Sequence, residues 1–215
     1  MKRIALIFCA ASLLLLACNS DKKTDEGKMD STTETKMDVK EKMEMPDSAT
    51  MKKNWQDYMS VGDVQKMMAT WDGTWDGEVT MWMEPGAPPQ VSKSTAVNKM
   101  IMNGLYQQGN HSGDMMGMPF MGQSTLGYDN HKKEFVSTWI DNMGSGIMVL
   151  KGTWDEASKT ITFKGTMTDM GTKGDADVKE TFKIIDDNTQ QMEMFATMPD
   201  GSEFKTMNIK YTRKK

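Results

Sequence analysis

Polar clusters interrupt the chain after Trp71 at nearly regular intervals, and this spacing constrains the possible fold more than any other feature. The clusters are rich in Gly, Pro, Asp and Asn, which tolerate the backbone angles of turns, and β-branched and aromatic residues separate them. Five such clusters are residues 84–89, 129–133, 155–159, 186–188 and 199–201. Strands bounded in this way, at intervals of roughly 10–15 residues, are typical of antiparallel hairpins that follow one another in sequence order.

A set of about nine or ten antiparallel strands closes most economically into a barrel, because closure removes the exposed edges of the sheet. The expected strands are about 74–83, 92–102, 104–111, 121–128, 134–142, 146–154, 159–168, 177–185, 190–197 and 203–213. The sequence therefore predicts a mainly β protein, an antiparallel up-and-down barrel of about nine or ten strands with one short N-terminal helix.

The short helix is expected just before the first strand. Ser60 and Asp63 have the spacing of a capping box, with Asp in the place that Glu usually takes. Apolar residues recur at helical intervals from there, which predicts a helix with one buried face. These residues are Val61, Val64, Met67, Met68 and Trp71.

The two ends of the expected barrel carry a Trp and an Arg that fit a known closure. Gly73-Thr74-Trp75 opens the first strand, and Tyr211-Thr212-Arg213 ends the last. A Gly-x-Trp on the first strand with an Arg on the last resembles the calycin superfamily of lipocalin-like barrels. The resemblance implies that Arg213 lies over Trp75 and closes one end of the barrel, through a cation–π contact worth about 0.5–2 kcal/mol.

A second resemblance covers nearly the whole domain, from about Met67 to Arg213. The motifs that carry it are Trp71-Asp72-Gly73-Thr74-Trp75, Gly117-Met118-Pro119-Phe120 through Gly127-Tyr128-Asp129, Trp139-Ile140-Asp141, Gly152-Thr153-Trp154-Asp155 and Tyr211-Thr212-Arg213. As a set they resemble the domain-of-unknown-function family numbered 1579. That family has no established activity, so the resemblance implies no catalytic residue.

The N-terminus has the features of an export signal with a lipid-attachment site. Lys2 and Arg3 precede an apolar stretch, residues 4–17, which is shorter than the about 20 residues that a membrane-spanning helix needs. The stretch ends in Leu15-Leu16-Ala17-Cys18, which resembles the lipobox of bacterial lipoproteins. The resemblance implies cleavage after Ala17, lipidation of Cys18 and, because the next residue is not Asp, sorting to the outer membrane. An ordinary signal peptide with an incidental cysteine is the alternative.

Composition divides the chain and limits its partners. Residues 18–53 are rich in Asp, Lys, Glu, Thr and Ser, with no aromatic residue before Trp55, so they cannot bury enough apolar surface to become ordered. We expect a signal peptide at 1–17, a lipidated disordered tether at 18–53 and the barrel domain at 54–215; a charged helix is the alternative within the tether. The formal net charge of −4 gives no electrostatic reason to bind nucleic acid.

The sequence contains no recognisable set of catalytic or cofactor-binding residues. The two histidines are His111, in a Gly-, Ser- and Asp-rich stretch, and His131, in an expected exposed turn. Zinc needs three or four ligands at recognisable spacing, and no Gly-x-Ser-x-Gly nucleophile elbow is present. The histidine through which a related group of calycin barrels binds haem has no clear counterpart. We therefore expect no cofactor, and we interpret Asp129, Asp141 and Asp155 as solvated turn residues.

Methionine is the unusual component, because the chain has 25, of which 18 follow Ser60, where leucine occurs only three times. Core filling in place of leucine is the leading interpretation, since unbranched Met fills irregular gaps. Thioethers are also soft ligands for Cu(I) or Ag(I), and exposed Met can scavenge oxidants by reversible oxidation. The candidate metal ligands are the clustered Met115, Met116, Met118 and Met121.

These observations lead to three hypotheses for function. The first is a lipid-anchored, non-catalytic binding module of the cell envelope that holds a small apolar ligand or an envelope partner. The second is a Met-rich Cu(I)- or Ag(I)-binding envelope protein. The third is an enzyme that uses carboxylates at the barrel mouth, for which no nucleophile–base pair is visible.

Overall fold

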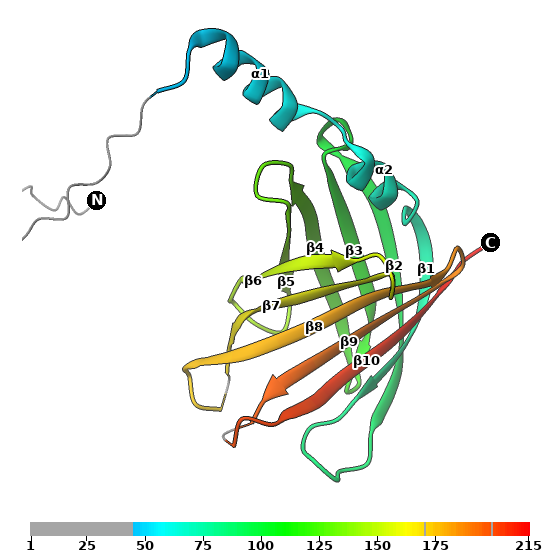
Figure 1. Ribbon diagram of the computed structural model, residues 1–215. Coiled ribbons are helices and arrows are strands. Elements are labelled where there is room, and N and C mark those ends of the chain that lie inside the picture. The colour runs from blue at the N-terminus through cyan, green and yellow to red at the C-terminus, as the bar shows by residue number, and fades with distance from the viewer. Residues whose placement is uncertain (1–44, 170, 199) are drawn as a thin grey trace, which may run out of the picture. The chain divides into compact units, whose positions relative to one another are not determined.

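The computed structural model describes residues 45–169, 171–198 and 200–215. The expected signal peptide, Cys18 and most of the expected tether lie outside the described residues. Strands make up most of the described chain (Figure 1). They are β1 (Gly73–Met81), β2 (Gln90–Ile101), β3 (Tyr106–Met115), β4 (Met118–Asp129), β5 (Glu134–Asp141), β6 (Met148–Asp155), β7 (Thr160–Thr168), β8 (Asp175–Asp186), β9 (Thr189–Thr197) and β10 (Glu203–Arg213).

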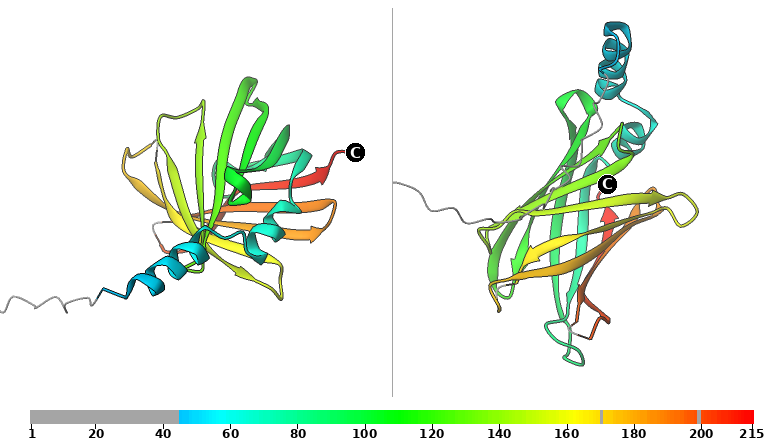
Figure 2. Two further views of the ribbon diagram at one scale, coloured as in Figure 1. Left: turned by 90° about the horizontal axis from the view of Figure 1, so that it is seen from above. Right: turned by 60° about the vertical axis from the view of Figure 1, so that its left-hand side comes forward.

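Each strand pairs antiparallel with its neighbour in sequence, and β1 also pairs with β10, so the sheet closes on itself (Figure 2). This confirms the predicted antiparallel up-and-down barrel. Side chains alternate between the inside and the outside of the wall, as the period of a strand requires. On β1, for example, Trp75, Gly77 and Val79 are buried inside, whereas Asp76 and Glu78 are exposed.

Two α-helices precede the barrel, and a short helix links β2 to β3. They are α1 (Ser48–Met59), α2 (Asp63–Ala69) and the 3-10 helix η1 (Met102–Gly104). α2 lies where the sequence predicts the helix. α1 begins inside the expected tether, because the Asp47 carboxylate accepts hydrogen bonds from the N–H groups of Ala49 and Thr50, both at 2.9 Å. Residues 48–53 are therefore helical, as in the charged-helix alternative, although α1 buries none of its side chains.

The start of α2 differs from the predicted capping box at Ser60 and Asp63. Gly62 is the N-cap residue, and its N–H donates to Gln65 Oε1 at 3.0 Å. The same side chain donates from Nε2 to Asn130 Oδ1 in the β4–β5 turn, at 3.0 Å. Gln65 caps the helix in place of the Ser60–Asp63 pair because it also binds Asn130 in a distant turn. A contact between residues so far apart in sequence cannot be predicted from a local capping pattern.

α2 closes one end of the barrel with apolar side chains. Met68 is fully buried and Trp71 is 3% exposed, and both pack against inward-facing residues of β5 to β8. These residues are Phe135, Leu150, Ile161, Phe163 and Val178. Burying one such side chain stabilises the fold by about 1.5–3 kcal/mol. Because these buried side chains gather under α2, we call this end of the barrel the packed end. Within the described residues, no helix is long and apolar enough to cross a membrane.

Arg213 fastens this closed end. Its guanidinium carbon lies 4.1 Å from the centroid of the Trp75 ring, so the contact expected from the calycin resemblance is present. The guanidinium also donates hydrogen bonds to the backbone carbonyls of Asp72 and Thr70, at 2.5 and 2.8 Å, and of Asp187, at 2.9 Å. One side chain therefore ties the last strand to the segment that joins α2 to β1.

The β3–β4 hairpin is longer than predicted. The Gly- and Ser-rich stretch around His111 is depleted in strand-forming residues, yet β3 continues to Met115 and β4 already begins at Met118, with the two strands paired throughout. The turn consists of Met116 and Gly117, whose φ angles are 54° and 79°. Pairing between two neighbouring strands outweighs the weak local propensity here, which extends the barrel wall by several residues.

Candidate functional site

The half of the barrel away from α2 is the candidate site, because its inward-facing side chains are only half-buried. Water therefore reaches them, in contrast to the packed end under α2. Methionine and aromatic residues predominate on this inner face. They are Met81, Met115, Phe120, Trp139, Met148, Met192, Met194 and Met207. Binding sites for small ligands are mostly apolar, with a few polar groups that fix orientation.

An aromatic platform, made of Trp139, Phe120 and His111, lies on β3 to β5. The Trp139 and Phe120 rings are stacked at 6.2 Å with 18° between their planes, and the His111 ring meets Trp139 edge-on at 5.0 Å. Gly122 makes room for the indole, since a Cβ there would lie 2.4 Å from the Trp139 ring. Trp139 Nε1 donates to Asp141 Oδ2 at 2.6 Å. The indole is thus held in one orientation.

His111 adds a neutral polar group to the platform. Burial lowers the pKa of His111 to about 4, so its ring carries no charge near neutral pH. Its Nε2 lies 3.4 Å from Ser124 Oγ. Both side chains crowd over Gly109, where a Cβ would lie 2.5 Å from Ser124 Oγ and 2.8 Å from His111 Nε2. His131 lies instead on an exposed turn, with its ring 4.8 Å from that of Tyr58.

The opposite wall, β8 to β1, carries a carboxylate in apolar surroundings. Glu180 faces inward, and its direct cross-strand neighbours are Phe163 and Met194. Burial raises the pKa of Glu180 to about 7, and no hydrogen bond or ion pair within the described chain counteracts this. Burial raises the pKa of Tyr211, and the negative charge of Glu180 raises it further. An ionisable group that lacks a partner costs stability, and such groups are concentrated at functional sites.

Three methionines lie level with Glu180 across adjacent strands. Met81 of β1 is the register partner of Met207 on β10, Met207 is the partner of Met194 on β9, and Met194 is the partner of Glu180 on β8. We call Met81, Met194 and Met207 the methionine row. All three are half-buried and pack against the apolar clusters of the barrel.

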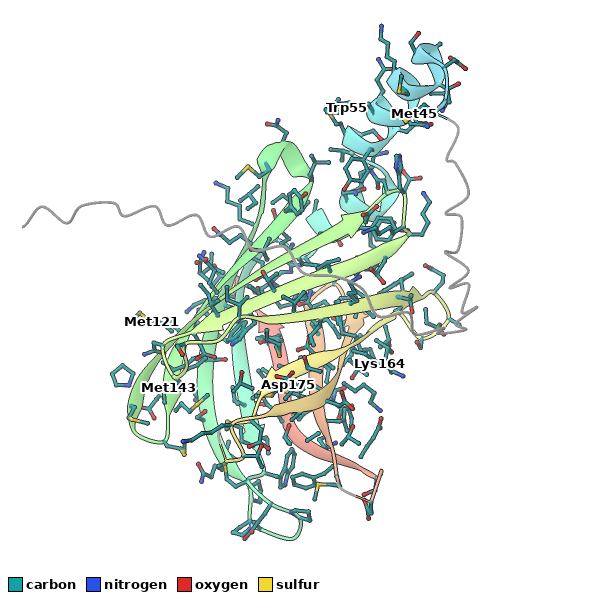
Figure 3. The ribbon with its side chains drawn as sticks, turned by 90° about the vertical axis from the view of Figure 1, so that its left-hand side faces the viewer. Met45, Trp55, Met121, Met143, Lys164 and Asp175 are labelled. Carbon is teal, nitrogen blue, oxygen red and sulfur yellow. The ribbon has the colours of Figure 1, made fainter. Side chains whose placement is uncertain are left out.

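The four methionines that the sequence groups as metal ligands do not converge. Met115 and Met118 are register partners across the hairpin, and Met116 lies in the turn with 54% of its surface exposed. Met121 faces outward, is 63% exposed and lies near Met143 at the edge of the barrel (Figure 3). A shared ion would need all four on one side of the wall.

The three aspartates considered for catalysis lie at different ends of the barrel. Asp129 and Asp155 accept hydrogen bonds from backbone N–H groups of their own turns, near α2, which lowers the pKa of both carboxyl groups. Asp141 lies at the other end, where it accepts from Trp139. Among the residues that the structure describes, no group of three or more His, Cys, Asp or Glu side chains could hold a metal ion.

One hollow lies on the outer wall of the barrel, and another lies at its open end. A groove of about 550 Å³ crosses the outer surface of β10, β1, β2 and β3, where opposite charges such as Asp76 and Lys93 lie together. This mixture of charges selects no particular ligand. A smaller pocket of about 160 Å³ lies at the open end, beside Met81, Met115 and Met116.

Glu180 and Trp139 are the two inner-face residues with the most distinctive surroundings, and neither stands out in the sequence motifs. Trp139 belongs to a family motif that is equally explained by hairpin chemistry. Glu180 shares its strand face with Val178 and Phe182, so alternation alone places a carboxylate among apolar residues. That alternation is the one local signal that points to Glu180.

Comparison with known proteins agrees with this architecture. The sequence profile of the family described as "Protein of unknown function (DUF1579)" matches residues 60–213. The crystal structure of Rv2717c from M. tuberculosis is similar in fold, with a TM-score of 0.55 and 10% identity over 73% of this chain and all of that one. A redesigned β-barrel is 16% identical over 68% of this chain and 96% of its own, with a TM-score of only 0.32, and a search of curated proteins gave no match. Because the family profile spans most of the chain, the protein belongs to the DUF1579 family.

Proposed function

We propose that this protein is a non-catalytic binding module that holds a small apolar or amphipathic ligand inside the open half of its barrel. The observation that carries the proposal is the aromatic platform, in which a half-exposed Trp139 is held between Phe120 and His111. A preorganised aromatic surface adds about 0.5–1.5 kcal/mol to the binding of another ring, beyond the burial of area. Because the platform faces inward, it favours a small ligand over a protein partner.

The platform also favours a ligand with one uncharged polar group. The neutral His111 ring and the Ser124 hydroxyl lie together beside the indole. Both can exchange hydrogen bonds with a ligand without the cost of desolvating a charge. An apolar body on Trp139 with a hydroxyl or carbonyl group toward His111 would fit this arrangement.

Replacing Trp139 with Ala is expected to weaken the binding of the neutral apolar probe N-phenyl-1-naphthylamine about tenfold, because the stacking surface is lost. Residues 45–215 form one compact unit with its own core, so this soluble fragment serves for a fluorescence titration. Ile140→Ala is the matched control, since Ile140 is the next residue on the strand, faces outward and is 45% exposed. Equal affinities for wild type and Trp139→Ala, or no binding by wild type, would contradict the proposal.

We also propose that Cys18 carries a lipid and holds the protein in the cell envelope, on the outer membrane. The lipobox-like Leu15-Leu16-Ala17-Cys18 at the end of a short apolar stretch supports this. Several acyl chains make anchoring effectively permanent, since each buried methylene contributes about 0.8 kcal/mol.

Replacing Cys18 with Ala in the full-length protein, expressed in its own host, is expected to abolish palmitate incorporation and release the protein from the membrane fraction. Radiolabelling followed by fractionation measures both effects. Retention of the Cys18→Ala variant in the membrane at the level of the wild type would contradict the anchor.

A further inference from the structure

β10 contains a β-bulge beside Met207, which faces the inside of the barrel in alternation with the buried Ile209 and Tyr211. Lys205 pairs with Phe195 and Met207 pairs with Met194, so Thr206 is an extra residue between them. Thr206 is fixed in the bulge, because its hydroxyl donates to Met194 O at 3.2 Å and its carbonyl accepts from the Trp82 N–H at 2.9 Å. Bulges redirect side chains and are frequent beside functional sites.

Cross-strand register makes the methionine row continuous. Direct cross-strand neighbours have Cβ atoms about 4.5–5.5 Å apart, and Met81, Met207 and Met194 occupy three such positions in succession. A Met side chain has three rotatable bonds and adapts its sulfur position easily. Three thioethers at this spacing can therefore approach one small ion from the same side.

Glu180 ends the row and has no ion-pair partner among the residues that the structure describes. Arg213 is committed to the backbone carbonyls at the closed end, and His111, on the opposite wall, is neutral. Among the described inward-facing residues around Glu180, the cross-strand neighbours are apolar and Tyr211 is the titratable group that senses its charge. A cation bound beside Glu180 would offset the cost of burying this carboxylate.

We propose that Met81, Met194 and Met207, together with the Glu180 carboxylate, form a binding site for one soft monovalent metal ion, Cu(I) or Ag(I). Thioether sulfur selects soft ions, and the single carboxylate balances the single positive charge. Ca²⁺ and Mg²⁺ require about six or more oxygen ligands, which this wall does not offer. This site is separate from the aromatic platform and goes beyond the proposed binding of an organic ligand.

The small pocket beside Met81 is a weaker location for the same ion. Met115 and Met116 line it together with Asp114. The Asp114 carboxylate already accepts a hydrogen bond from the Gly117 N–H at 2.8 Å and thereby caps the hairpin turn. The row, in contrast, ends in a carboxylate without a partner.

Silver binding tests the site, because Ag(I) needs no reductant and resembles Cu(I) in its preference for sulfur. Native mass spectrometry and calorimetry on fragment 45–215 are expected to show one Ag(I) bound with sub-micromolar affinity. The triple variant Met81→Leu/Met194→Leu/Met207→Leu is expected to weaken binding at least about 100-fold. Met-to-Leu changes nearly conserve volume, so the triple variant is expected to keep its fold. Glu180→Gln is expected to weaken binding about tenfold, since it removes the charge and keeps the thioethers.

Two comparison variants locate the ion. Met67→Leu/Met100→Leu removes two half-buried methionines that pack against the core outside the row, and its silver affinity is expected to be unchanged. Met115→Leu/Met116→Leu/Met118→Leu removes the hairpin cluster, and loss of binding there instead of in the row variant would overturn the proposal. So would an unchanged row variant or a wild type that binds no silver.

A measurement on the wild-type protein tests the site even if one of the variants fails to fold. With ¹³C-labelled methionine methyl groups, Ag(I) is expected to shift the resonances of Met81, Met194 and Met207 most. Single Met-to-Leu variants assign the three signals. Larger shifts at Met115 and Met116 than at the row, or no shifts at saturating silver, would contradict the site.

Discussion

Replacing Arg213 with Met is expected to lower the free energy of unfolding by about 3 kcal/mol. The change removes a cation–π contact worth about 0.5–2 kcal/mol and three hydrogen bonds from a charged donor to the carbonyls of Thr70, Asp72 and Asp187. Urea unfolding of fragment 45–215 measures the difference, and the melting temperature is expected to fall by about 10 °C.

Two further variants separate the roles of the Arg213 charge and its planar shape. Arg213→Lys keeps a cation near Trp75 but cannot donate in three directions from a rigid plane, so about half of the loss is expected. Lys210→Met changes an exposed residue on the outer face of the same strand and is expected to alter the unfolding free energy by less than about 0.5 kcal/mol. A loss below about 1 kcal/mol for Arg213→Met would show that Arg213 does not fasten the closed end.

Replacing Glu180 with Gln is expected to stabilise the protein at pH 8 by about 2 kcal/mol. The pKa of Glu180 is raised from 4.5 to about 7 by burial, which corresponds to about 3 kcal/mol. Because water reaches this half-buried side chain, screening reduces the expected effect to about 2 kcal/mol. Glutamine has nearly the same shape and no charge, so it removes the penalty while the packing is kept.

The sign of this effect depends on pH in a defined way. Below pH 4.5 the carboxyl is neutral in both the folded and the unfolded state, and the Gln variant is expected to match the wild type. Between 4.5 and about 7 the unfolded state releases its proton more readily, so the wild type loses stability as pH rises, and above 7 the full penalty remains. Urea unfolding at pH 4.5, 6 and 8 measures it, with the exposed Glu78→Gln as the control. Equal or lower stability of Glu180→Gln at pH 8 would contradict the burial of an unpartnered carboxylate.

A residue that costs stability in the absence of ligand points to function. Natural proteins keep such residues where activity requires them, and removing them stabilises the fold at the expense of function. Glu180 fits this description, because we expect Glu180→Gln to make the fold more stable and to bind silver more weakly. Opposite effects of one substitution on stability and on binding would distinguish a ligand site from ordinary packing.

The strand order and most strand bounds could be predicted from the sequence, because turn chemistry and period-two alternation are local properties. The closure of Arg213 over Trp75 could be predicted from the resemblance to calycin barrels, and its backbone hydrogen bonds could not. α1 escapes prediction because Asp47 caps a segment whose composition is that of a disordered chain. Gln65 replaces the expected Ser60–Asp63 cap because Asn130, far along the chain, binds it.

The candidate site depends on tertiary relations that no local pattern contains. Met115, Met116, Met118 and Met121 are close in sequence, yet strand alternation and the turn separate them. Met81 and Met207 are far apart in sequence, yet barrel closure makes them register partners. Met207 faces inward in alternation with Ile209 and Tyr211, but its pairing with Met81 and Met194 depends on barrel closure and register, which a single sequence does not show. Clustering of residue types along the chain therefore does not show which side chains share one face of the barrel.

Native mass spectrometry most directly tests the proposal that the open half of the barrel interior holds a small ligand. The full-length protein, purified from its own host in mild detergent, is expected to carry a bound small molecule. That mass is expected to persist in Ile140→Ala and to disappear in Trp139→Ala. The bare mass of the chain in the wild type, or a bound mass that Trp139→Ala retains in full, would contradict the proposal.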